Sequence, residues 1–189
     1  MRYLLLSLIA TGAALASEPA AFDYQLLATN RTSTMQKEMN EAAGKGYHYS
    51  SFMGGETSFG GHEVVVVMVK PLHKTDDSPR EYRLIAAHSA SALEKDMKRA
   101  GEDGFEYKGN TSFRPDAGAS REVLVIMERS AASASRKYSY QFLATVRTST
   151  MQKELQQAGQ GGFKLLGVAL SQTTIGIDQV VAILGKEGQ

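Results

Sequence analysis

The sequence predicts an α+β protein made of three tandem β-α-β-β repeats. Residues 24–38 return almost unchanged as residues 140–154, and only two positions differ between the two copies. A weaker copy, residues 82–96, starts 58 residues after the first copy and 58 residues before the last. An even period of this length is the signature of a repeated structural unit.

The composition indicates a globular chain and argues against several classes of function. Of 189 residues, 42% are hydrophobic and 22% are charged, and the formal net charge is +1. These values are typical of a folded protein and give no basic surface for nucleic acid or for an anionic membrane. The absence of cysteine excludes disulfides, thiolate metal sites and cysteine nucleophiles. The repeats must therefore be stabilised by their packed core.

Residues 1–16 have the pattern of a secretory signal peptide. Arg2 precedes a short apolar run, and small residues at Ala14 and Ala16 predict cleavage before Ser17. The alternative, a membrane-spanning helix, needs roughly 20 apolar residues, and this run is shorter. We therefore expect a periplasmic or secreted protein with no stable membrane insertion after cleavage.

Each repeat is expected to begin with a short strand, at residues 24–29, 82–87 and 140–145. In the first copy, the alternating positions Tyr24 and Leu26 fall on one face of the strand. The equivalent positions of the other two copies follow the same alternation.

A short amphipathic helix is expected after each first strand. Ser33, Ser91 and Ser149 each open a Ser-x-x-Gln/Glu capping box, which predicts a helix start at that serine. Apolar residues then recur at i, i+4 and i+7, and we interpret the methionines among them as core rather than as a ligand surface. Glycines after these stripes are expected to end the helices in left-handed caps: Gly44, Gly101 and Gly159.

Two further strands complete each repeat. The second opens after a glycine that is followed by an aromatic residue, and the third is the most apolar segment and ends on a basic residue. A crossover helix makes the first two strands parallel, and a hairpin makes the third antiparallel to the second. We predict the strand order 1-3-2, with the third strand central and buried on both faces. The third strands are expected at residues 63–70, 122–129 and 179–186.

The expected domain boundaries follow the repeats. The repeats span residues 23–70, 81–129 and 138–186, and polar linkers without periodicity lie between them, at residues 71–80 and 130–137. A unit of this size without a disulfide is near the lower limit for independent folding. We therefore expect the three sheets to pack together as one pseudo-threefold body. The alternative is three separate domains on linkers.

The repeats resemble a small bacterial β-α-β-β domain of unknown function. That family has an aromatic-rich first strand, then Leu-Asn-x-x-Gly-x-x-Gly-Trp-Glu, then a closing strand that ends in Lys or Arg. Residues 39–47 read Met-Asn-Glu-Ala-Ala-Gly-Lys-Gly-Tyr, and the closing strand ends at Lys70. The resemblance covers residues 23–186, although Tyr47, Phe105 and Phe163 stand where the family has tryptophan. The layout is also similar to that of dodecins and small periplasmic stress proteins, and neither resemblance implies an activity.

Motifs that carry catalysis or cofactor binding are not found in the sequence. There is no Gly-x-Ser-x-Gly elbow, no phosphate loop and no Gly-x-Gly-x-x-Gly motif. The four histidines never recur at equivalent repeat positions. We predict no catalytic residue, no cofactor and no metal site.

One binding hypothesis concerns the start of the first and third helices. A helix N-terminus offers unpaired N–H groups, and a preceding arginine with hydroxyl groups can complete an anion site. The alternative is that the serine caps the helix and the arginine is solvated. The candidate residues are Arg31, Ser33 and Thr34 in the first repeat and Arg147, Ser149 and Thr150 in the third.

The sequence therefore favours an exported, non-catalytic repeat protein of the cell envelope. Its partner is expected to be a protein or a small anionic ligand, bound through variable loops or repeat interfaces. The alternative is a cell-envelope enzyme, hydrolase-like, with a site in a cleft between repeats.

Overall fold

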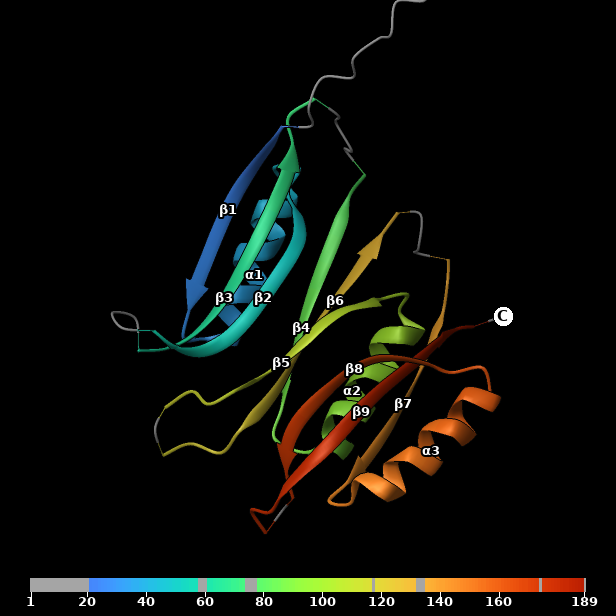
Figure 1. Cartoon of the computed structure of the whole chain (residues 1–189). Coiled ribbons are helices and arrows are strands. Elements are labelled where there is room, and N and C mark those ends of the chain that lie inside the picture. The colour runs from blue at the N-terminus through green and yellow to red at the C-terminus, as the bar shows by residue number, and fades with distance from the viewer. Residues whose placement is uncertain are drawn as a thin grey trace, which may run out of the picture.

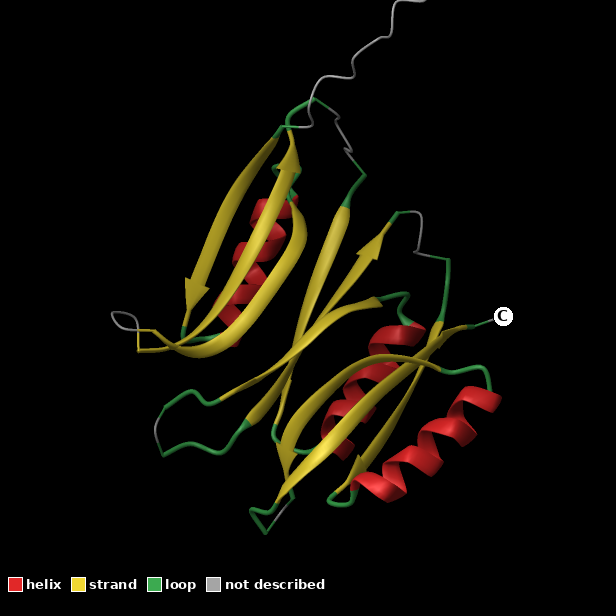
Figure 2. Ribbon diagram, in the orientation of Figure 1, coloured by secondary structure: helices red, strands yellow, loops and turns green. Residues whose placement is uncertain are grey.

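Each repeat forms one three-stranded sheet and one helix (Figures 1 and 2). The computed structural model describes residues 21–57, 61–73, 78–116, 118–131, 135–173 and 175–188, so the predicted signal peptide lies outside the described residues. The elements are β1 (Phe22–Thr29), α1 (Thr32–Ala43), β2 (His48–Thr57) and β3 (Gly61–Pro71), then β4 (Arg80–Ala87), α2 (Ala90–Glu102), β5 (Glu106–Phe113) and β6 (Glu122–Ser130), then β7 (Tyr138–Thr145), α3 (Thr148–Gln160), β8 (Lys164–Gln172) and β9 (Asp178–Glu187).

The predicted strand order is confirmed in all three repeats. The sheets run β1-β3-β2, β4-β6-β5 and β7-β9-β8, and every neighbouring pair is antiparallel. The third strand of each repeat lies in the centre of its sheet, where it pairs with the second strand on one edge and with the first strand on the other. The α+β class with three tandem β-α-β-β repeats is therefore confirmed.

The three repeats pack as one body, in a row. Each of the first two helices lies between its own sheet and the sheet of the next repeat, so that α1 contacts β4 and α2 contacts β7. Figure 1 shows the first and third sheets at opposite ends of the row, with the second sheet between them. The expected pseudo-threefold closure is not formed.

Equivalent tyrosines show why the row is open. Tyr82 and Tyr140 are 1% and 3% exposed, because each inserts into the repeat before it, whereas the equivalent Tyr24 is 63% exposed. A closed ring would bury all three side chains alike. The contact between repeats is head-to-tail, and such a contact closes into a ring only when the rotation between units allows it.

The central strands are buried according to their place in the row. β6 is buried on both faces, from Val123 to Met127, and β9 is buried in the same way, from Val181 to Leu184. In β3 only the face toward α1 is fully buried, because no described element covers the other face of the first sheet. Burial on both faces is thus correct for two of the three central strands.

The helices start earlier than the capping boxes predicted. The N-cap residues are Arg31, Ser89 and Arg147, and Ser33 and Ser149 lie inside the first turn. Only Ser89 uses its side chain as a cap, and its hydroxyl oxygen accepts the N–H of Ala92 at 3.3 Å. The predicted capping boxes are wrong because the connection from strand to helix is shorter than the serine pattern implies.

The helices end in Schellman motifs, but at other glycines than expected. In α1 the N–H of Tyr47 donates to the carbonyl of Ala42 at 3.1 Å, and the N–H of Gly46 donates to that of Ala43 at 2.9 Å. The left-handed residue is Gly46, with φ 84°, and Gly104 and Gly162 take its place in the other repeats. Gly44 is right-handed, and Gly101 and Gly159 lie inside their helices.

The basic residue that closes each third strand stabilises the end of the helix in its own repeat. Its charge lies over the aromatic ring that follows the Schellman glycine, and its nitrogen donates to a backbone carbonyl just after the end of the helix. The three sets are Lys70 with Tyr47 and Lys45 (2.8 Å), Arg129 with Phe105 and Asp103 (3.0 Å), and Lys186 with Phe163 and Gly161 (3.4 Å).

We expect Arg129→Ala to lower the free energy of unfolding by about 1–2 kcal/mol, because it removes a charged hydrogen bond and a cation–π contact. Arg129→Lys is the matched control, since lysine fills this place in the other two repeats, and it should lose much less. Urea unfolding of both variants measures the difference. Equal losses in the two variants would contradict the capping role.

Candidate functional site

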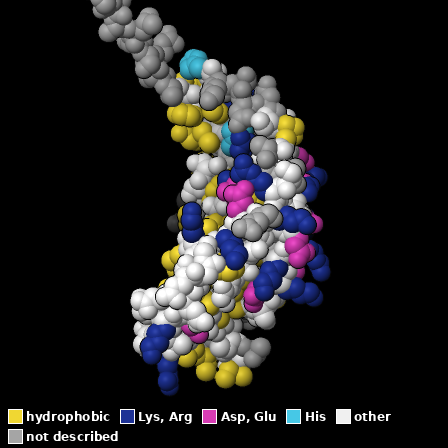
Figure 3. Space-filling view, turned by 90° about the vertical axis from the view of Figure 1, so that its right-hand side faces the viewer, with side chains coloured by type: hydrophobic (Ala, Val, Ile, Leu, Met, Phe, Trp, Pro, Cys, Tyr) yellow, Lys and Arg dark blue, Asp and Glu magenta, His cyan; other side chains and the backbone are white. Residues whose placement is uncertain are grey.

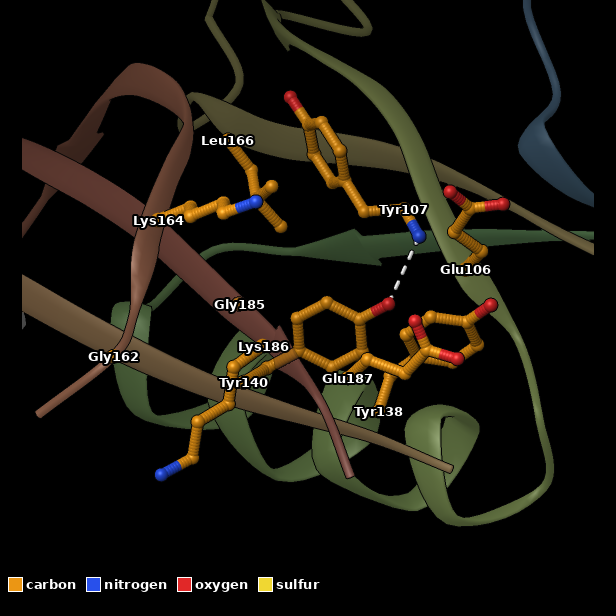
Figure 4. Close-up of a pocket in the computed structure, with 10 residues that line it drawn as sticks. All are labelled: Glu106, Tyr107, Tyr138, Tyr140, Gly162, Lys164, Leu166, Gly185, Lys186 and Glu187. Carbon is orange, nitrogen blue, oxygen red and sulfur yellow. Dashed lines mark hydrogen bonds between the residues drawn. The ribbon is translucent and has the colours of Figure 1, made fainter. Parts of the chain in front are cut away.

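A pocket of about 400 Å³ lies where the second repeat meets the third. Its walls come from β5, β7, β8 and β9, and its size is within the range of small-molecule sites. Figure 4 shows its lining residues, which are Glu106, Tyr107, Tyr138, Tyr140, Gly162, Lys164, Leu166, Gly185, Lys186 and Glu187.

The pocket lies at a junction where a glycine replaces the carboxylate of the other junction. In the second sheet Tyr82 pairs with Glu128, and in the third sheet the equivalent Tyr140 pairs with Gly185. At the first junction the Glu128 carboxylate fills the space and binds the hydroxyl of Tyr82 at 2.6 Å and Arg80 at 3.2 Å. At the second junction Gly185 has no side chain, and the Leu166 side chain and the Tyr140 ring lie against it, so that an added Cβ atom would be 2.6 Å from Leu166 Cδ1.

Tyrosine rings form one wall of the pocket. The rings of Tyr138 and Tyr140 are stacked, with centroids 6.5 Å apart and planes at 23°. The Tyr140 hydroxyl donates to the carbonyl of Phe105 and accepts the N–H of Tyr107, both at 2.9 Å (Figure 4 draws the second bond). The Tyr140 ring is therefore held rigidly across the junction.

The tyrosine hydroxyls of the pocket stay protonated at neutral pH. Burial raises the pKa of Tyr140 well above its usual 10 and raises the pKa of Tyr107 to about 12. Burial also raises the pKa of Tyr138, and the Glu106 carboxylate adds to this effect. These phenols can offer hydrogen bonds and ring faces to a ligand, but they are not general bases near pH 7.

The charged groups of the pocket leave one cation without a partner. Lys108 lies 3.5 Å from the carboxylate of Glu106, and Arg136 lies 3.4 Å from that of Glu187. Lys164, in contrast, forms no ion pair or hydrogen bond within the residues that the structure describes. The pocket therefore combines ring faces with a positive charge that is available to an anion.

The predicted anion-site residues lie elsewhere. Arg31, Ser33 and Thr34 are at the start of α1, and Arg147, Ser149 and Thr150 are at the start of α3, in repeats at opposite ends of the row. The structure does not bring the two sets together, and all three residues of the third-repeat set are exposed.

The local structure at these helix starts is set by threonines. The N–H of Arg31 donates to Thr29 Oγ1 at 3.2 Å, and the N–H of Arg147 donates to Thr145 Oγ1 at 3.0 Å. The arginine side chains take no part in capping. Anion binding at these two helix starts stays a prediction.

Sequence reasoning missed the tyrosine pocket. Tyr107 and Tyr140 are distant in the sequence, and their contact depends on how two repeats pack. One signal was present, because Gly185 interrupts an apolar central strand, and a glycine in a strand often marks a close approach or a ligand site.

Comparison with known proteins adds no family: no family model matches the chain, and no match is found among curated proteins or solved structures. Among the described helices, none is long and apolar enough to cross a membrane. In the same described ranges, no three His, Asp or Glu side chains gather closely enough to hold a metal ion.

Proposed function

We propose that this chain is an exported, non-catalytic binding protein of the cell envelope, and that its ligand is a small organic anion. The pocket at the junction of the second and third repeats is the proposed binding site. The observation that carries the proposal is that Lys164, whose side chain has no partner in the described residues, lines the same pocket as the stacked rings of Tyr138 and Tyr140 and ends next to Leu166 (Figure 4).

The chemistry of the pocket favours a ligand with a flat apolar body and an acidic group. Aromatic walls bind flat apolar surfaces, and a lysine ammonium attracts a carboxylate or a phosphate as a point charge. The repulsion between an anion and the two rim carboxylates is reduced by nearby cations: Arg136 pairs with Glu187, and Lys108 lies 3.5 Å from both Glu106 and Glu128.

The alternative function is a hydrolase with its site in the same cleft. Its two carboxylates, Glu106 and Glu187, are each about half exposed and each ion-paired, which favours charge balance over acid–base catalysis. A broad hydrolase screen distinguishes the two functions. Turnover that is lost in Glu106→Gln would favour the enzyme.

We expect aromatic carboxylates or phosphates to stabilise the protein in thermal unfolding, by about 2.7 kcal/mol at a ligand concentration of about 100 times Kd. Lys164→Gln should raise Kd at least about tenfold, which is about 1.4 kcal/mol of binding free energy. The control is Lys153→Gln on the exposed side of α3, which should leave Kd unchanged.

A second variant separates the pocket from the helix N-termini. Arg31→Ala/Arg147→Ala should bind the same compounds with unchanged Kd, since neither residue lines the pocket. The proposal is wrong if no compound in the panel stabilises the protein, or if Lys164→Gln binds as tightly as the wild type.

A further inference from the structure

The two junctions inside the chain are built in the same way. One repeat presents its helix and its second strand, which we call the tail face. The next repeat presents the open side of its sheet, with a tyrosine from the first strand, which we call the head face. In this way Tyr82 and Tyr140 insert into the repeats before them.

A row of three repeats leaves one head face and one tail face uncovered. Among the described residues, the exposed large hydrophobic side chains come from the first and third repeats, apart from Leu72 after β3, and none comes from the second repeat. In Figure 3 hydrophobic side chains gather near the top and at the bottom of the view, and basic and acidic side chains are interspersed between. The exposed set is Phe22, Tyr24, Leu26, Met53, Val146, Leu165, Val168, Leu170, Ile175 and Ile177.

The free head face belongs to the first sheet. Leu26 pairs with Val67 on this face, and the equivalent pairs are Leu84 with Ile126 and Phe142 with Ile183. Ile126 and Ile183 are fully buried by the preceding repeat, whereas Leu26 is 67% exposed. The first sheet thus has the apolar pattern of a covered face, but no element among the described residues covers it.

The free tail face belongs to α3 and β8. In the second repeat the equivalent face binds the third repeat through Asn110 and Ser112, which donate to the carbonyls of Val168 and Leu170 at 2.9 and 2.8 Å. One period later, these positions are occupied by Val168 and Leu170 themselves, whose side chains are 53% and 46% exposed.

The helix of the tail face is shaped for close contact with a strand. A Cβ atom on Gly101 of α2 would lie 2.2 Å from the carbonyl oxygen of Tyr138 and 2.9 Å from the ring of Tyr140. The equivalent glycine of α3, Gly159, faces open space. Gly159 therefore leaves room for a first strand that the chain itself does not provide.

The tail face also carries groups that can hold a strand edge. On α1, Gln36 accepts the N–H of Leu84 at 2.9 Å, and Asn40 binds both the N–H and the carbonyl of Tyr82 at 2.8 and 2.9 Å. At the equivalent places α3 has Gln152 and Gln156, and both are exposed. An amide side chain is thus present at each position where α1 holds the edge of β4.

From these equivalences we infer that the free head face of one chain binds the free tail face of a second copy of the same chain. In this contact β1 lies along α3, and Tyr24 inserts beside β8. The Tyr24 hydroxyl accepts the N–H of Leu165 and donates to the carbonyl of Phe163. The Tyr140 hydroxyl makes the same two bonds with Tyr107 and Phe105. This inference does not depend on the proposed ligand.

A second copy is favoured over an unrelated partner because both halves of the contact already occur together inside the chain. The free faces differ from the internal faces in side-chain size, and a larger residue on one free face is matched by a smaller residue on the other. Ser51 stands where the covered sheets have Gly109 and Gly167, and the residue that would face it is Leu165, which is shorter than Tyr107. The contact is heterologous, so assembly either grows along the row or closes as a ring.

Sedimentation velocity of residues 17–189 over a range of concentrations tests the inference. Wild-type protein should form dimers and larger species as concentration rises. Leu26→Arg blocks only the head face, and Gly159→Arg blocks only the tail face. Each variant alone should stay monomeric, and an equimolar mixture should give a heterodimer, because each variant keeps the face that the other lacks.

Three results would overturn the inference. The first is wild-type protein that stays monomeric at every concentration, and the second is a mixture that gives no heterodimer although circular dichroism shows both variants folded. The third is self-association of Gly159→Arg alone, which would mean head-to-head contact. If either variant fails to fold, Tyr24→Asp replaces Leu26→Arg and Leu165→Glu replaces Gly159→Arg, with the same expectations.

Discussion

Replacing Gly101 with alanine should lower the free energy of unfolding by about 2 kcal/mol or more, whereas the same change at Gly159 should raise it by up to about 1 kcal/mol. Both glycines lie inside helices at equivalent positions, so both gain about 0.8–1 kcal/mol of helix propensity from alanine. Only Gly101 faces a neighbour, since its Cβ would meet the backbone of Tyr138 at 2.2 Å.

The backbone of β7 cannot give way at Gly101 without moving the third repeat. Overpacking of this kind typically costs about 1–3 kcal/mol and costs more where backbone must shift. Urea unfolding of both variants in dilute solution, where the chain is monomeric, measures the two changes. Equal effects at the two glycines would mean that α2 does not pack against β7 as described.

Alkaline pH should destabilise the protein steeply once it exceeds about 10. Burial raises the pKa of Tyr82 and Tyr140 far above the usual 10, and the bond to Glu128 raises that of Tyr82 further. Below pH 10 the folded and unfolded chains both keep these protons, so stability is unaffected. Above pH 10 the unfolded chain loses protons that the folded chain keeps, so the free energy of unfolding falls.

The expected slope is at most about 1.4 kcal/mol per pH unit for each buried tyrosine. Urea unfolding between pH about 9 and about 11.5 measures it. Tyr140→Phe should reduce the slope by one proton. An unchanged slope in Tyr140→Phe would show that this hydroxyl titrates freely in the folded protein.

Sequence patterns were sufficient to predict the repeat and the order of its strands. The 58-residue period and the apolar third strands are local properties, and the connection rules leave few topologies for a β-α-β-β unit. The predicted helix starts were wrong because Arg31 and Arg147 are N-caps without a capping side chain, so the serine pattern placed each start two residues too late.

The packing of the repeats into a row, and the pocket between the second and third repeats, could not be predicted from local sequence patterns. The placement of one repeat on the next depends on close approaches, such as Gly101 against Tyr138 and Gly167 against Asn110, and the sequence does not show which neighbour a glycine meets. The pocket lies beside the position where Gly185 replaces Glu128, and this replacement could not be interpreted before Tyr82 and Tyr140 were known to insert there.

The central claim is that the three repeats form an open row whose ends are complementary. Lys37, Lys95 and Lys153 occupy equivalent, exposed positions on α1, α2 and α3, and the chain has no native cysteine. Spin labels on cysteines at two of these positions at a time give three distances by pulsed electron spin resonance in dilute solution. The row predicts that the distance from 37 to 153 clearly exceeds the other two, and three equal distances would contradict it.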